Sequence, residues 1–169
     1  PDLAALTTVT FDMWETLIVE DRDIGLKRAQ LRIDGTAQAL SQTGYHYSDD
    51  LIWTAYWACA KVCSEIRDEG RDIPFDEQVR IFINGIKPDL SIELPEFTKQ
   101  KITCVYDQSF CAYPTPLHPD ALSILSRVKR EGFKIGLISN TGMTPGRTVR
   151  SYMDKVGILQ FFNALVFSD

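Results

Sequence analysis

The chain has 169 residues, of which 44% are hydrophobic and 24% charged, proportions that suit one or two compact globular units and exclude a disordered chain. Its formal net charge is −5, and basic residues are interspersed with acidic ones, so neither nucleic acid nor an anionic membrane is an expected partner. No apolar run is long enough to cross a bilayer, and the first residues, Pro1-Asp2-Leu3-Ala4, lack the features of a signal peptide.

The cysteine pattern indicates structural thiols in a reducing compartment. The four cysteines are Cys59, Cys63, Cys104 and Cys111, and they form no C-x-x-C pair. Cys59 and Cys63 lie one helical turn apart in an apolar stripe, which is typical of buried free thiols. The two histidines, His46 and His118, are far apart in the sequence, which argues against a zinc site. We therefore expect a cytoplasmic protein.

The chain begins with a predicted hydrophobic strand at 7–12 and continues with a long helical block. Apolar residues at helical spacing predict four helices. These are expected at 24–43, 49–69, 76–86 and 95–110. For the second, Ser48 is the expected N-cap and Gly70 the stop. Residues 18–112 are thus predicted to be helical, with no strand among them.

A proline-rich stretch, Pro114-Thr115-Pro116-Leu117-His118-Pro119, ends the helical block and predicts a domain boundary. Beyond it, helical and strand patterns alternate. The expected elements are a helix at 120–131, a strand at 134–139, a helix at 145–156 and a strand at 164–167. Thr144 is the expected cap of the second helix, with Pro145 in its first position. This alternation predicts parallel strands joined by right-handed crossovers, hence an α/β core that the helical block interrupts.

Two strand ends carry residues that could do chemistry. Asp12 follows the first strand, and chemistry in open α/β sheets takes place beyond the carboxyl ends of the strands. A carboxylate there can attack an electrophile and form a covalent ester. The strand at 134–139 ends in Ser139-Asn140-Thr141-Gly142, just before a helix. A hydroxyl and free N–H groups at such a turn form an anion site, although an ordinary Asn-Gly type of turn would have the same sequence.

The segment Phe11-Asp12-Met13-Trp14-Glu15-Thr16-Leu17-Ile18 resembles the opening signature of the haloacid dehalogenase (HAD) superfamily, and Ser139 resembles its second motif. The resemblance implies a Rossmann-like core, residues 1–17 and 113–169, with a parallel sheet, interrupted by an all-helical cap at 18–112. It implies a hydrolase with Asp12 as nucleophile, acting on a small molecule. Thr16 would then steady the nucleophile loop.

The resemblance also assigns the binding groups of the site. Ser139 would bind the transferred group, with Asn140 and Thr141 offering N–H groups to it. The Asp12 carboxylate and the backbone carbonyl of Trp14 would ligate Mg²⁺, an ion that takes few protein oxygens and keeps waters. Asp12, Thr16 and Ser139 are therefore the expected catalytic residues, and Trp14 lines the anion site.

Trp14 is a departure from the pattern of the superfamily's phosphatases, which carry a second Asp here as general acid. Indole cannot protonate a leaving group, and the neighbouring Glu15 should point elsewhere. Dehalogenases of the superfamily carry an aromatic residue at this position, because a halide leaves unprotonated. Three functions follow: a Mg²⁺-dependent phosphatase on a small phosphate ester, a metal-independent 2-haloacid dehalogenase, or a catalytically silent HAD-like binding module. The first is favoured by how common phosphatases are in the superfamily.

Two further motifs of the superfamily, a Lys and an acidic pair, normally lie beyond a segment like Phe167-Ser168-Asp169. Without them we expect a C-terminally incomplete core and feeble hydrolysis, since the Lys screens the charge between nucleophile and substrate. The sequence also begins without Met, so a trimmed or processed chain is expected. The open sheet edge could pair with a second copy to form a homodimer.

Aromatic and basic residues in the helical block leave two alternatives open. Trp53, Tyr56 and Trp57 lie on one expected helix and are expected to form a core stripe, with a substrate-facing aromatic wall as the alternative. Arg22, Arg28 and Arg32 could contact an anionic ligand, and a solvated helix face explains them equally well.

Overall fold

A computed structural model of the protein describes residues 6–169. The chain starts with strand β1 (Thr8–Phe11) and then forms five helices in succession. These are α1 (Arg22–Ser41), α2 (Asp49–Asp68), α3 (Phe75–Ile86), α4 (Leu90–Glu93) and α5 (Glu96–Ala112). The remainder alternates as α6 (Ala121–Arg130), β2 (Lys134–Ser139), α7 (Gly146–Lys155), the short 3-10 helix η2 (Leu159–Phe161) and β3 (Ala164–Phe167). The predicted α/β class is confirmed.

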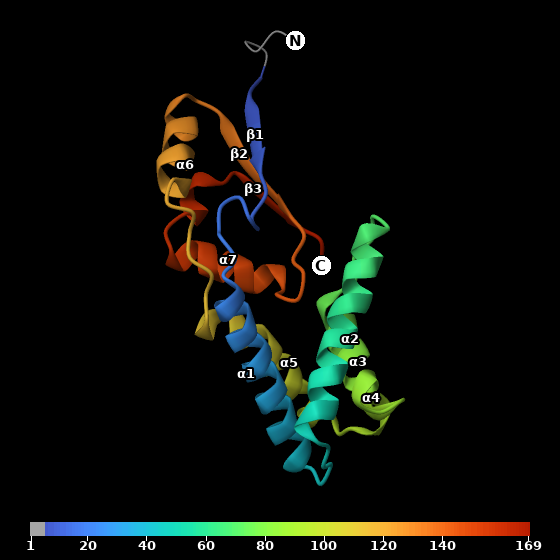
Figure 1. The fold of residues 1–169 in the computed structure, drawn as a ribbon. Coiled ribbons are helices and arrows are strands. Elements are labelled where there is room, and N and C mark those ends of the chain that lie inside the picture. Colours follow the sequence, from blue (N-terminus) through green and yellow to red (C-terminus); the bar gives the residue numbers. More distant parts are fainter. Residues whose placement is uncertain (1–5) are drawn as a thin grey trace.

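The three strands form one parallel sheet in the order β1-β2-β3. Its two faces differ sharply. Ile135 and Leu137 are almost completely buried, whereas Ile138 and Val166, on the opposite face, are each 57% exposed. Helices α6 and α7 supply the side chains that cover the buried face, and Figure 1 shows both helices beside the strands.

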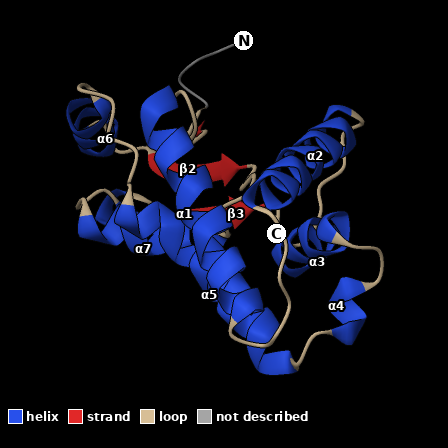
Figure 2. Ribbon diagram, turned by 60° about the horizontal axis from the view of Figure 1, so that its bottom comes forward, coloured by secondary structure: helices blue, strands red, loops and turns tan. Residues whose placement is uncertain are grey.

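The buried side chains form two clusters. The first joins residues of α1 to α5, with Phe82 and Tyr106 among its largest members. The second joins the sheet to α6 and α7, and it also contains Ile18 and Phe110. Within the first cluster, α1 packs chiefly on α5 and α2 on α3 (Figure 2). The helical block therefore has its own hydrophobic core, and Ile18 and Phe110 join it to the sheet.

Local signals explain most of the boundaries. Ser48 caps α2 as expected, because its hydroxyl accepts the N–H of Leu51. The one-turn helix α4 was not predicted, since four residues are too few to show a period. The expected cap of α7 is wrong: Pro145, not Thr144, occupies the cap position. The carboxylate of Asp169 instead accepts the Gly146 N–H, at 3.0 and 3.1 Å.

Cys59 and Cys63 are free and buried, as predicted, while Cys104 and Cys111 are free and exposed. None of the helices formed by residues 6–169 combines the length and apolar character that crossing a membrane requires.

Candidate active site

The strand register brings the two predicted motifs to the same edge of the sheet. Phe11 pairs with Leu137, so Asp12 leaves β1 beside the last residues of β2. Asp12 is exposed at this position. Ser139, the final residue of β2, is only 4% exposed, and its hydroxyl makes a long 3.4 Å contact with the Asn140 carbonyl. An exposed carboxylate and a weakly bonded hydroxyl thus occupy adjacent strand ends.

The turn after Asp12 is held by its backbone. The Met13 carbonyl accepts the N–H groups of Leu17 and Ile18, at 2.9 and 3.1 Å. Glu15 adopts a left-handed conformation, with φ of 54°, and its carboxylate accepts the N–H of Glu20 at 3.0 Å. This bond turns the Glu15 carboxylate toward the chain that leads into α1. Thr16 lies exposed in the same turn.

Ser168, the residue directly after β3, holds the loop that follows β2. The Thr141 N–H donates to the Ser168 hydroxyl at 3.0 Å, so the expectation that this N–H is free for an anion is wrong. The Thr141 hydroxyl also lies 3.4 Å from that of Ser168. Gly142 has a φ of +57°, which an L-residue with a side chain rarely adopts. The groups of this loop that remain for a ligand are the exposed Asn140 and the hydroxyls of Ser139 and Thr141.

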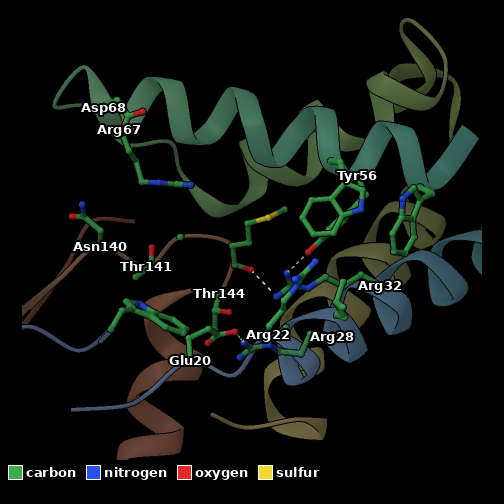
Figure 3. A pocket seen from close by; sticks show the side chains of 17 residues that line it. Glu20, Arg22, Arg28, Arg32, Tyr56, Arg67, Asp68, Asn140, Thr141 and Thr144 are labelled. Carbon is green, nitrogen blue, oxygen red and sulfur yellow. Dashed lines mark hydrogen bonds and ion pairs between the residues drawn. The ribbon is translucent and has the colours of Figure 1, made fainter. Parts of the chain in front are cut away.

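A cavity of about 950 Å³ lies between this loop and the helices. Trp14, Asn140, Thr141 and Thr144 line it on the sheet side, while α1 and α2 supply most of the other side chains (Figure 3). Asp12 and Ser139 are not among its lining residues. The cavity therefore begins two residues from the expected nucleophile and extends toward the helical block.

Arg28 belongs to a buried polar cluster at the cavity wall. The guanidinium pairs with the Glu20 carboxylate and donates to the Thr115 hydroxyl at 3.1 Å. The Thr115 hydroxyl in turn donates to Glu20 at 2.9 Å, and Arg28 also lies over the Phe110 ring. Arg28 is 6% exposed. A solvated helix face is therefore the wrong explanation for this arginine.

Arg32 is buried more deeply, at 4% exposed, and it connects four segments. Its guanidinium donates to the Ser109 hydroxyl at 2.8 Å, the Tyr56 hydroxyl at 3.1 Å and the Met143 carbonyl at 3.0 Å. The guanidinium also lies 4.9 Å from the centre of the Tyr106 ring. Burial raises the pKa of Tyr106 well above its ordinary value, so this phenol is neutral and does not offset the arginine charge.

Trp14 and two tryptophans of α2 add an aromatic lining. Trp14 packs edge-to-face on Phe110, and its indole N–H is buried without a hydrogen-bond acceptor among the described residues. Trp53 and Trp57 are 37% and 43% exposed and both line the cavity. The expected core stripe is thus wrong for these two residues, whereas Tyr56 is buried.

The sheet edge offers few donors to a metal ion. Among residues 6–169, no three His, Cys, Asp or Glu side chains gather closely enough to hold one. The Asp12 carboxylate and the Trp14 carbonyl are oxygen donors of the kind that suits Mg²⁺, which keeps several waters when it binds. These two groups fit a partial site for a hydrated ion.

Sequence reasoning singled out Asp12, Trp14 and the loop after β2, and it left the roles of the arginines open. It did not identify Glu20 or Thr115. Only the arginine spacing hinted at this cluster: Arg28 and Arg32 are four residues apart and so share one face of a helix.

No protein-family model matches the chain, and no curated protein matches it either. Several solved structures do match the chain. A HAD phosphatase from Thermococcus onnurineus matches with a TM-score of 0.53 at 21% identity, over 97% of this chain and 63% of its own. A protein of Bacillus subtilis described as a HAD-hydrolase, bound to magnesium, matches with 0.54 at 15%, over 96% and 64%.

A predicted phosphoglycolate phosphatase from Haemophilus somnus matches with a TM-score of 0.52 at 14% identity, over 97% of this chain and 63% of its own. The chain thus spans somewhat less than two thirds of the length of these proteins. At this level of identity the likeness shows the fold, which is that of the HAD-like superfamily.

Proposed function

We propose that this protein, whose chain has the HAD-like fold, is a hydrolase that uses Asp12 as a covalent nucleophile on a small phosphate ester. The observation that carries the proposal is the register of β1 and β2, which puts Asp12, exposed, and Ser139 at the ends of neighbouring strands, next to the Asn140–Thr141 loop. Transfer of a phosphoryl group to a carboxylate requires a nucleophile and anion-binding groups at one place, and here both are candidates at one edge of the sheet.

In the first step, an Asp12 oxygen attacks phosphorus and the bond between phosphorus and the leaving oxygen breaks. Ser139 and Thr141 bind phosphoryl oxygens through their hydroxyls. Water then attacks the aspartyl phosphate, which releases inorganic phosphate and restores the carboxylate. The Asp12 carboxylate and the Trp14 carbonyl would hold Mg²⁺, which when bound neutralises charge on the phosphoryl group.

Trp14 limits which leaving groups can depart. Its indole cannot give a proton to the leaving oxygen, and Glu15 is bonded to the backbone of Glu20. Substrates whose leaving groups are stable as anions should therefore react fastest. We expect 4-nitrophenyl phosphate to be hydrolysed at least about tenfold faster than phenyl phosphate. A positioned general acid normally accelerates the departure of a leaving group by about 10²-fold or more, and a poor leaving group loses that acceleration here.

The proposal is tested by phosphate release from 4-nitrophenyl phosphate in the presence of Mg²⁺. Asp12→Asn should lower kcat/KM by at least about a thousandfold, because a carboxamide cannot form the covalent intermediate. Glu15→Gln is the matched control and should retain activity within about tenfold. Activity that survives Asp12→Asn would refute the assignment of the nucleophile.

A second candidate, carbon–halogen hydrolysis, is favoured by one observation: the Trp14 indole N–H is buried at the cavity without an acceptor in the described part of the chain. In that reaction an Asp12 oxygen displaces halide from carbon, and water hydrolyses the resulting ester. Halide leaves without a proton, and the indole N–H can donate to it. Chloride release from 2-chloropropionate with EDTA present, lost on Asp12→Asn, would support this function over the first.

A further inference from the structure

Arg32 is a buried positive charge with no counter-charge. No salt bridge joins it to a carboxylate of residues 6–169, whereas the neighbouring Arg28 pairs with Glu20. All three acceptors of Arg32 are neutral oxygens. An ionised group that is 4% exposed is costly to bury unless it is paired. This arginine therefore lacks the anion that burial of a guanidinium normally requires.

The hydrogen-bond count leaves room for that anion. A guanidinium has five N–H groups, and Arg32 uses one on Nε and one on each terminal nitrogen. One N–H on each terminal nitrogen remains, the number that a carboxylate binds in a bidentate pair. The Tyr56 hydroxyl, which accepts from Arg32, keeps its own proton to donate. In Figure 3 the Arg32 guanidinium and the Tyr56 hydroxyl converge at the cavity.

The lining of the cavity as a whole is positively charged. Its lining contains four arginines, at 22, 28, 32 and 67, against two carboxylates, Glu20 and Asp68. Arg67 also pairs with Asp72 at 3.8 Å, so the formal charge of the lining together with Asp72 is +1. The whole chain carries −5. A positive cavity in an acidic protein concentrates small anions, because low-dielectric walls focus the field.

The wall formed by α2 is rich in aromatic rings. Trp53 and Trp57 lie edge-to-face with ring centres 5.8 Å apart, and Trp57 meets Tyr56 in the same way at 5.2 Å. Both tryptophans are more than a third exposed although they are large apolar side chains. Exposed aromatic rings inside a cavity are suited to stack against a planar ligand.

We propose that the cavity binds a substrate whose non-reacting end combines a planar apolar body with a carboxylate, and that Arg32 recognises the carboxylate. This substrate class rests on the proposed function, because it describes the part of the substrate beyond the group that reacts at Asp12. Tyr56 supplies a second donor to the carboxylate, and the rings of Trp53 and Trp57 contact the planar body.

A pair of probes that differ only in charge tests the proposal on the unmodified protein. 2-Naphthoate carries the planar body and the carboxylate, and 2-naphthylmethanol carries the same body without the charge. Isothermal titration should show that naphthoate binds at least about tenfold more tightly, the value of one charge-assisted hydrogen-bonded pair. Equal affinities, or no saturable binding of naphthoate, would overturn the proposal.

The variant Arg32→Met tests whether this side chain causes the preference for naphthoate. The variant should bind naphthoate and naphthylmethanol with equal affinity. Arg130→Met is the matched control, since Arg130 is exposed on α6, outside the cavity, and it should leave the tenfold preference intact. A preference that persists in Arg32→Met would refute the role of Arg32. If loss of the bonds to Ser109 and Met143 unfolds that variant, Arg32→Lys replaces it. This variant keeps the charge but loses the bidentate geometry, and it should weaken naphthoate binding and leave naphthylmethanol binding unchanged.

The same titration separates this inference from the proposed function. Asp12→Asn should bind naphthoate as the unmodified protein does, because Asp12 does not line the cavity. Naphthoate preference without hydrolysis of 4-nitrophenyl phosphate would mean that the carboxylate site exists and the proposed reaction is wrong. Hydrolysis that depends on Asp12, with no naphthoate preference, would mean the reverse.

Discussion

Glu20 is the residue whose replacement should show most directly how the cavity wall is stabilised. Its carboxylate pairs with the Arg28 guanidinium through one oxygen and accepts the Thr115 hydroxyl through the other. Glu20→Gln keeps the shape but leaves a buried guanidinium without a counter-charge. Removing one partner of a fully buried pair costs about 3–5 kcal/mol. Because the Glu20 side chain is 33% exposed, solvent screens the pair, and we expect a loss of about 1–2 kcal/mol.

Urea denaturation of the unmodified protein and the variant measures this loss. The matched control is Glu77→Gln, which removes the carboxylate of an exposed pair with Arg80, whose side chain is 56% exposed, and should cost much less than Glu20→Gln. In a double-mutant cycle, Glu20→Gln and Arg28→Met should show a coupling energy of about 1 kcal/mol. The reasoning is refuted if Glu20→Gln costs no more than Glu77→Gln.

Two further predictions concern packing and pH. A Cβ at Gly35 would lie 2.5 Å from a Val105 methyl, so Gly35→Ala should destabilise the α1–α5 contact by up to about 2 kcal/mol, because about 1 kcal/mol gained in helix propensity offsets part of an overpacking cost of about 1–3 kcal/mol. Thermal unfolding should show this loss disappear in a Val105→Ala background, and persistence there would contradict the steric cause. Burial raises the pKa of Tyr152 to about 12 from 10.0, so the unfolded chain loses its proton first and stability falls as the pH rises from 10 to 12. Urea unfolding at pH 9 and 11.5 should show a smaller fall in Tyr152→Phe, and an equal fall would assign the effect to other groups.

The sequence predicted the framework because its signals are local. The strand that ends at Phe11 and the one that ends at Ser139 each show a hydrophobic run with a polar terminus, and parallel pairing follows from the intervening helices. Since parallel strands end at one edge, the neighbouring positions of Asp12 and Ser139 could be inferred without coordinates.

The cavity could not be inferred in the same way, because its contacts join distant segments. The sequence left Arg32 open between a ligand contact and a solvated helix face, because its burial involves Ser109 in α5 and Met143, which is 111 residues away. Trp57 reads as a core residue of α2, yet it is 43% exposed and lines the cavity. Helical periodicity assigns a face to each side chain, but it does not say which other element covers that face.

The identity of residue 14 connects the two ends of the proposed substrate. In the proposed reaction, an indole in place of a carboxylic acid would restrict Asp12 to leaving groups that depart as stable anions. The ligand proposed for the cavity that starts at Trp14 is a planar body with a carboxylate, and an aromatic ring placed there would itself stabilise a departing oxyanion. The proposed ligand would thus match the chemistry that the site lacks. An aryl phosphate with a carboxylate on its ring satisfies both conditions. For such a substrate, Arg32 should act on KM and Asp12 on kcat, because only Asp12 takes part in the bond that forms.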